Sequence, residues 1–119
     1  MSSQQPVPAD LAREARDLVE QVNHAVLDAP EALTAPRIHE TTRALMQLVE
    51  RLPQTFEQLA DVLELRAREG AIRMDTAEDP DAAARAAAED LRAAAAEAHQ
   101  LARHLTQPAG ALFSMAHHD

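Results

Sequence analysis

The chain has 119 residues, a length that suits one domain. Its hydrophobic content of 46% consists largely of alanine, because 27 Ala stand beside 14 Leu, only 2 Phe, and no Trp, Tyr or Cys. The absence of cysteine excludes a disulfide scaffold, thiol catalysis and cysteine-ligated metal. The shortage of β-branched and aromatic residues excludes a β-sandwich, so the composition predicts an all-α protein.

The net charge is −9, with 20 acidic residues against 11 basic residues that are all arginine. An acidic surface repels phosphate groups, so the charge disfavours nucleic acid and anionic membranes as partners. Residues 1–8 lack the basic and apolar regions of a signal peptide, and no stretch approaches the ~18 apolar residues that cross a bilayer. We therefore expect a cytoplasmic protein with no membrane partner.

The first helix is predicted over residues 10–28, after a flexible polar leader at residues 1–8. The helix is expected to end before Pro30, because the residue before a proline avoids the α region. Its apolar or small residues recur at alternating steps of four and three, which indicates one face of an amphipathic helix. These residues are Leu11, Ala15, Leu18, Val22, Ala25 and Ala29.

The second helix is predicted over residues 36–52, with apolar residues every seven positions at Ile38, Leu45 and Leu52. Thr34 is a suitable N-cap, and a proline at position 36 is tolerated in a first helical turn. Pro53 is expected to end this helix, because its ring and missing N–H remove a backbone hydrogen bond. A kinked continuous helix is the alternative.

The third helix is predicted over residues 55–74, because Thr55-Phe-Glu-Gln58 matches a capping box that starts a helix. The apolar periodicity continues through Gly70 to Met74. We therefore place Gly70 inside this helix, on its packed side, where the lack of a side chain lets a neighbouring backbone approach.

The fourth helix is predicted over residues 80–106. Asp79 followed by Pro80 is a strong start signal, because Asp caps helices and proline suits the first helical position. Ala84, Leu91, Ala98 and Leu105 recur every seven residues, and the many alanines between them favour helix. Gln107-Pro108 is expected to end it, leaving a tail over residues 108–119 whose apolar residues suit one further turn.

Four helices with short connectors predict an antiparallel four-helix bundle over residues 9–107, with a long alanine-rich C-terminal helix and coiled-coil-like packing. The expected core comprises Leu18, Val22, Leu45, Val49, Leu59, Leu63, Leu91, Ala98 and Leu101.

Residues with catalytic or ligand-binding spacing are scarce. The six histidines form neither H-x-x-x-H nor H-E-x-x-H, and there is no glycine-rich phosphate loop. The acidic residues lie outside the apolar stripes, where solvation leaves a carboxylate without the shifted pKa that acid–base catalysis needs. We therefore expect no enzyme activity, no cofactor and no metal.

One segment is similar to a known motif around a histidine. Ala98-His99-Gln100-Leu101 resembles the start of the A-H-x-L-K-G motif of histidine phosphotransfer domains, which are acidic four-helix bundles of about this length. The resemblance implies a phosphate-accepting role for His99. Ala102 and Arg103 depart from the lysine and glycine of that motif. A helical histidine beside the core stripe is the alternative.

A second segment, Thr55–Met74, resembles the opening helix of a helix-turn-helix. The resemblance implies a small DNA-associated regulator with Arg66, Arg68 and Arg73 on the phosphates. The tight turn of the motif is missing, because Glu64-Leu-Arg-Ala67 consists of strong helix formers.

The apolar surface itself supports the leading hypothesis. Only about a quarter of the residues are apolar and larger than alanine, which leaves a lone monomer marginally stable. We therefore expect a non-catalytic interaction protein, either a homodimer or bound to another helical protein. The residues expected at the contact are Leu91, Ala95, Ala98, Leu112 and Phe113.

Overall fold

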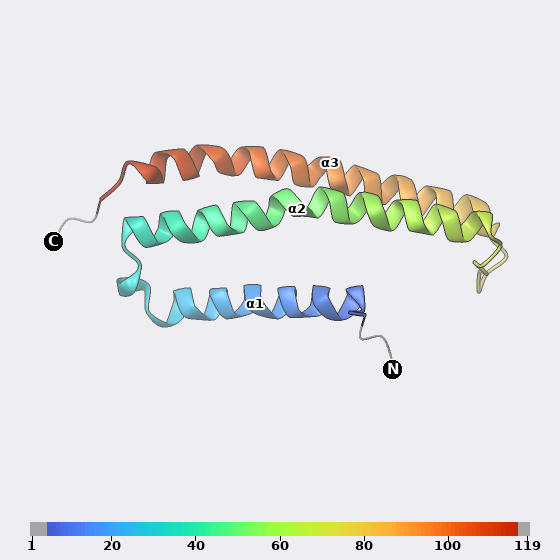
Figure 1. The fold of residues 1–119 in the computed structure, drawn as a ribbon, viewed down its shortest axis with the longest axis horizontal. Helices are drawn as coiled ribbons and strands as arrows, with labels where there is room; N and C mark the ends of the chain where they lie inside the picture. The colour runs from blue at the N-terminus through green and yellow to red at the C-terminus, as the bar shows by residue number, and fades with distance from the viewer. Residues whose placement is uncertain (1–4, 117–119) are drawn as a thin grey trace.

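The computed structural model describes residues 5–116, and over this stretch the chain forms three α-helices, one 3-10 turn and no strand (Figure 1). The elements are α1 (Pro8–Asp28), η1 (Pro30–Ala32), α2 (Ala35–Arg68) and α3 (Pro80–Phe113). The all-α class is confirmed. The four-helix count is wrong, because the second and third predicted helices are one. Parts of the predicted leader and tail, residues 1–4 and 117–119, lie outside the described residues.

Helix α2 runs without interruption through Pro53. The proline leaves the carbonyl of Val49 without its usual N–H donor. Thr55 does not cap a new helix. Its hydroxyl donates instead to the carbonyl oxygen of Arg51, over 3.3 Å. Pro53 is itself buried on the side of α2 that packs against α3, so tertiary packing offsets the local cost of the proline.

The C-terminus of α2 is a glycine cap. Gly70 has a φ of +71°, the left-handed conformation that glycine adopts at little cost. The N–H of Gly70 donates to the carbonyl of Ala67 and the N–H of Ala71 to the carbonyl of Arg66, each over 3.0 Å. These two bonds form a Schellman motif. The predicted interior position of Gly70, and a helix reaching residue 74, are therefore wrong.

Helix α3 begins where the sequence predicts. The carboxylate of Asp79 accepts a hydrogen bond from the N–H of Ala82 over 3.2 Å, and Pro80 occupies the first turn. At the other end, α3 passes through Pro108 and ends at Phe113, so the prediction that Gln107-Pro108 ends the helix is wrong. Thr34 caps α2 as predicted, accepting from the N–H of Arg37 over 3.4 Å.

Helices α2 and α3 form an antiparallel hairpin, and each contributes one heptad row to the seam between them. The α3 row contains six buried alanines, which allow the two helices to approach closely. The six are Ala84, Ala88, Ala95, Ala98, Ala102 and Ala109. The α2 row, called the seam row, is His39, Thr42, Met46, Val49, Pro53, Phe56, Ala60, Leu63 and Ala67, all of them buried or half-buried.

Helix α1 lies alongside the hairpin, antiparallel to α2, and its backbone comes close only to η1 (Figure 1). Both α1 and α2 are described in full, and no Cα atom of one lies within 8 Å of a Cα atom of the other. None of the residues of α1 is buried. The radius of gyration is 19.5 Å, against about 13.5 Å for a compact domain of this length. The chain is therefore elongated, and one helix is unpacked.

Most of the residues predicted to form the core are not buried. Of the nine predicted residues only Ala98 is buried, and Leu18, Leu59 and Leu101 are exposed. The remaining five are half-buried: Val22, Leu45, Val49, Leu63 and Leu91. The difference arises because α1 does not pack closely against the hairpin and because the core consists mainly of alanine.

Candidate interaction surface

A second apolar row runs along α2, displaced by one residue from the seam row. This open row consists of Ile38, Thr41, Leu45, Leu48, Leu52, Thr55, Leu59 and Val62. It has the same alternating steps of three and four as the seam row, and therefore forms a stripe about 100° around the helix from the seam. Like the seam row, the stripe winds slowly around α2, by about 20° per heptad. The row contains no charged residue. Helix α2 thus has two faces suited to helix packing, of which α3 covers one.

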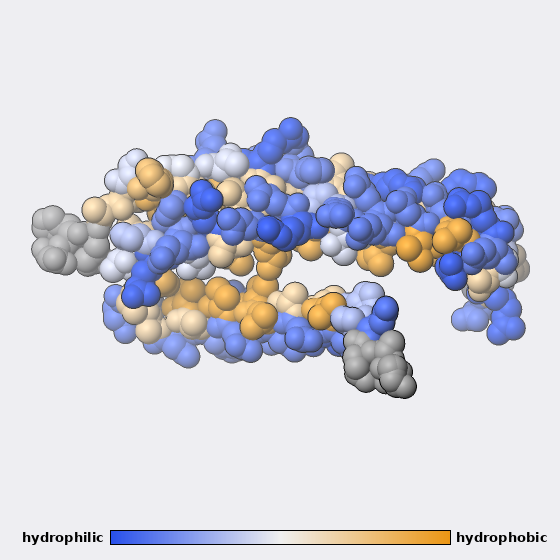
Figure 2. All heavy atoms as spheres, viewed as in Figure 1, coloured by the Kyte–Doolittle hydropathy of each residue, from blue (hydrophilic) through white to orange (hydrophobic). Residues whose placement is uncertain are grey.

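The open row is exposed over much of its length. Ile38, Leu48, Leu59 and Val62 are exposed, Val62 at 53%, and Leu65 continues the apolar surface past the end of the row. Helix α1 has 21 residues and is about 31 Å long, whereas α2 has 34 residues and is about 51 Å long. In Figure 2, apolar atoms are visible on the stretch of α2 that α1 does not reach.

The apolar side of α1 faces α2 across an open groove (Figure 2). The row on α1 is the predicted one, but Leu11 and Leu18 are more than half exposed. The axes of packed helices lie 8–10 Å apart, which brings some Cα atoms of the two helices within 8 Å of each other. No Cα atoms of α1 and α2 come that close, so the two helices are not packed. The groove is lined by Val22, Ala25, Val26, Ala29, Ala32, Leu33, Arg37 and Thr41.

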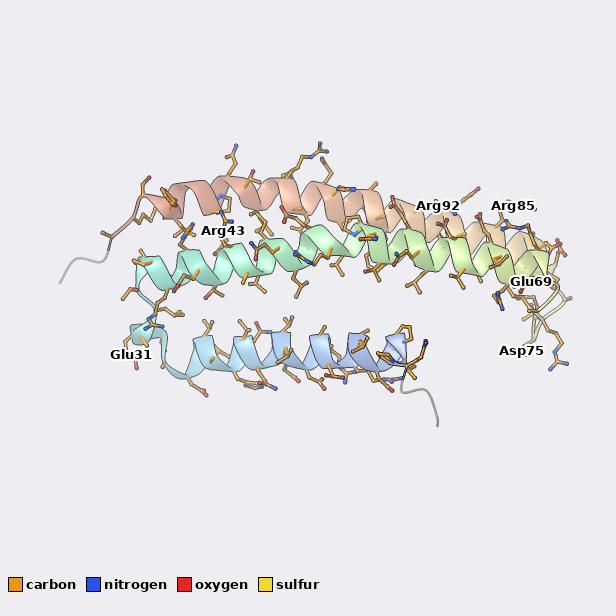
Figure 3. All side chains as sticks on the ribbon, viewed as in Figure 1. Glu31, Arg43, Glu69, Asp75, Arg85 and Arg92 are labelled. Atoms are coloured by element: carbon orange, nitrogen blue, oxygen red, sulfur yellow. The ribbon has the colours of Figure 1, made fainter. Side chains whose placement is uncertain are left out.

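A charged cluster joins α2 and α3 in the half of the hairpin nearer the turn. The guanidinium of Arg92 on α3 donates to both carboxylate oxygens of Glu64 on α2, over 3.0 and 2.8 Å, and to Asp61 over 2.8 Å. The hydrogen bonds that Arg92 donates hold the pKa of Glu64 below its ordinary value, and donating to the carboxylates of Glu64 and Asp61 raises the pKa of Arg92. Figure 3 shows Arg92 and Arg85 on the part of α3 near the turn. The three side chains are partly exposed and pair with one another between the two helices.

The residues predicted for the contact do not share one open face. Ala95 and Ala98 are buried in the seam, so α2 already covers them. Leu91 and Leu112 are half-buried. Phe113 is 76% exposed, with its ring edge-to-face against His39 at a centroid distance of 5.7 Å. Sequence reasoning missed the open row as a surface, although the seven-residue spacing of Ile38, Leu45 and Leu52 was its signal.

The arginines of the DNA alternative lie near the end of α2 and in the following loop. Arg66 pairs with Glu69 over 3.1 Å, and Arg68 lines a shallow charged groove together with Glu64 and Asp81. Arg73 lies in the loop after Gly70. Thr55 to Arg68 is the second half of one long helix followed by an antiparallel helix, whereas helix-turn-helix pairs cross at about 90–120°.

No protein family, curated protein or solved structure matches this chain. Among the described residues, no three His, Asp or Glu side chains come together as a metal site would require. In the same stretch no helix combines the length and apolar character needed to cross a membrane. The open row and the apolar side of α1 are the candidate functional site, because both are apolar and much of each is exposed.

Proposed function

We propose that this chain is a non-catalytic interaction protein that binds a helical partner, a second copy included, through the open row of α2 and the apolar side of α1. The observation that carries the proposal is the open row. Its eight positions keep heptad spacing over 25 residues without a charge, a pattern that in packed helices marks a face covered by another helix. A helix face with no partner gains nothing from such regularity.

The accessible surface of the chain supports the same proposal. The structure exposes 9182 Å², whereas a compact monomer of 13.0 kDa exposes about 6,300 Å². The excess is about 2,800 Å². Surface patches of several hundred Å² that are apolar mark interaction sites in soluble proteins. Binding of a partner helix would remove part of this excess from water.

Matched glutamate variants test the proposal by affinity capture from the native cell. Leu59→Glu places a charge in the open row, at a residue that is 47% exposed and does not belong to the seam row. Leu27→Glu is the control, because Leu27 is 76% exposed and lies on the side of α1 away from its apolar row. We expect protein bound by the wild type to be retained by Leu27→Glu and lost by Leu59→Glu. Equal binding by all three chains would contradict the proposal.

A phosphotransfer role for His99 is the second candidate, because His99 is exposed on α3 as phosphate transfer requires. A small phosphodonor should then label the chain, and His99→Ala should abolish the label. Absence of label in the wild type would remove this candidate.

A further inference from the structure

We infer that the occupant of the open row is a second copy of this chain, with the two α2 helices antiparallel and related by a two-fold axis near Glu50. This inference rests on the proposed function and names its partner. Two-fold dimers use the same patch on both subunits, so the patch must be complementary to itself when reversed. The open row meets that requirement.

The row is symmetric about position 50. Reversing it brings Leu48 against Leu52 of the partner subunit, and Leu45 against Thr55 of the partner subunit. Further out, Thr41 meets Leu59 of the partner subunit, and Ile38 meets Val62 of the partner subunit. All eight positions are then paired, each threonine faces a leucine, and no layer buries a charge, which would be costly without a partner. The order of the residues is Ile38, Thr41, Leu45, Leu48, Leu52, Thr55, Leu59 and Val62.

Packing of α1 against α2 of the same chain would not cover the whole open row. Helix α1 is about 20 Å shorter than α2, and runs beside its first part only. Leu59 and Val62, exposed at 47% and 53%, lie toward the other end. An antiparallel second copy covers both halves equally, because each half meets the opposite half of its mate. Obligate dimers bury roughly 2,000–5,000 Å² in total. Each whole chain, with the unpacked α1 included, exposes about 2,800 Å² more than a compact monomer, so a dimer of this size is compatible with the surface that two chains expose.

The oligomeric state of the full chain is the first measurement. From about 1 to about 100 µM, sedimentation of the wild type should give a mass of twice 13.0 kDa. Leu48→Glu changes the central layer and should give a single-chain mass while circular dichroism keeps the helix content. Leu27→Glu, the matched control outside the row, should remain dimeric. A single-chain mass for the wild type, or a dimer that survives Leu48→Glu, overturns the inference.

Cysteine crosslinking tests the antiparallel register independently, and the absence of native cysteine makes it specific. The double variant Thr41→Cys with Leu59→Cys should form a covalent dimer on oxidation, because each new cysteine faces the other type in the mate. The two positions are 18 residues apart on one helix, about 27 Å, so no bond forms within a chain. Thr41→Cys alone should not crosslink. A crosslink in the single variant, or none in the double variant, contradicts the antiparallel pairing.

Failure of this inference is distinguishable from failure of the proposed function. If the wild type is a monomer and the capture experiment still shows binding that Leu59→Glu abolishes, the inference of a homodimer is wrong and the proposal that the open row binds a partner is supported. If the wild type is a monomer and capture does not depend on the open row, both are wrong.

Discussion

The two glycines provide a paired test of the structure, because the same substitution should have opposite effects at the two positions. A Cβ atom added at Gly70 or at Gly110 would meet no atom within 4 Å, so neither Gly→Ala change creates a clash. Only the backbone differs. Gly70 has a φ of +71° and closes the Schellman motif, whereas Gly110 lies in the last turns of α3 with ordinary helical geometry.

The magnitudes follow from the backbone alone. An L-residue in the left-handed conformation costs about 1–2 kcal/mol, so Gly70→Ala should lower the free energy of unfolding by about 1 kcal/mol. Asparagine tolerates this conformation, so Gly70→Asn should lose less. Gly110→Ala should raise the free energy of unfolding by up to about 1 kcal/mol, because alanine is the better helix former. The effect at Gly110 is smaller if the helix end frays.

Thermal unfolding at one fixed protein concentration measures these differences, because association makes the Tm depend on concentration. For a chain of this length 1 kcal/mol corresponds to a Tm change of roughly 4 °C. Gly70→Ala should melt below the wild type and Gly110→Ala at or above it. An unchanged or higher Tm for Gly70→Ala would refute the glycine cap and restore an interior position for Gly70.

Three further outcomes are expected from features of the hairpin. Because Arg92 holds the pKa of Glu64 below its ordinary value of 4.5, the ion pair stabilises the fold at neutral pH, and this stabilisation is lost as the pH falls through the folded-state pKa. Glu64→Gln should therefore reduce the acid dependence of the free energy of unfolding, and an unchanged pH profile would contradict this. Ala88→Leu should lower the free energy of unfolding by about 1–3 kcal/mol by overpacking the seam, whereas Ala86→Leu, at an exposed position, should be nearly neutral in the same denaturant titration. Asp79→Ala should cost about 1 kcal/mol by removing the cap of α3 while Asp79→Asn costs little, and equal stability of the two variants would exclude the capping role.

Local sequence signals were sufficient to predict the all-α class and the positions of several helix ends. Thr34 and Asp79 cap helices where a cap is predicted, because a capping hydrogen bond spans only three residues and needs no tertiary information. The predictions for Pro53 and Gly70 are wrong. A proline ends an isolated helix, but its effect here depends on packing against α3, a segment remote in the sequence.

The candidate site was harder to predict than the fold. Leu45 and Leu59 belong to the open row and Val49 and Leu63 to the seam row, yet their spacing is equally regular, so periodicity alone assigns all four to one core. Heptad spacing indicates that a face is apolar and leaves open which helix covers it. In the structure, the alanine row of α3 packs closely on the seam row of α2, and much of the open row stays exposed.

The hairpin geometry also orders the events of folding. Contacts beside the turn, such as Arg92 with Glu64, join residues 28 apart, whereas His39 and Phe113 meet only after nearly the whole hairpin has been closed. Loop-closure entropy grows with the length of the loop, so the seam should form first at the turn and extend toward the ends. Substitutions beside the turn should then slow folding, and those at the open end should mainly speed unfolding.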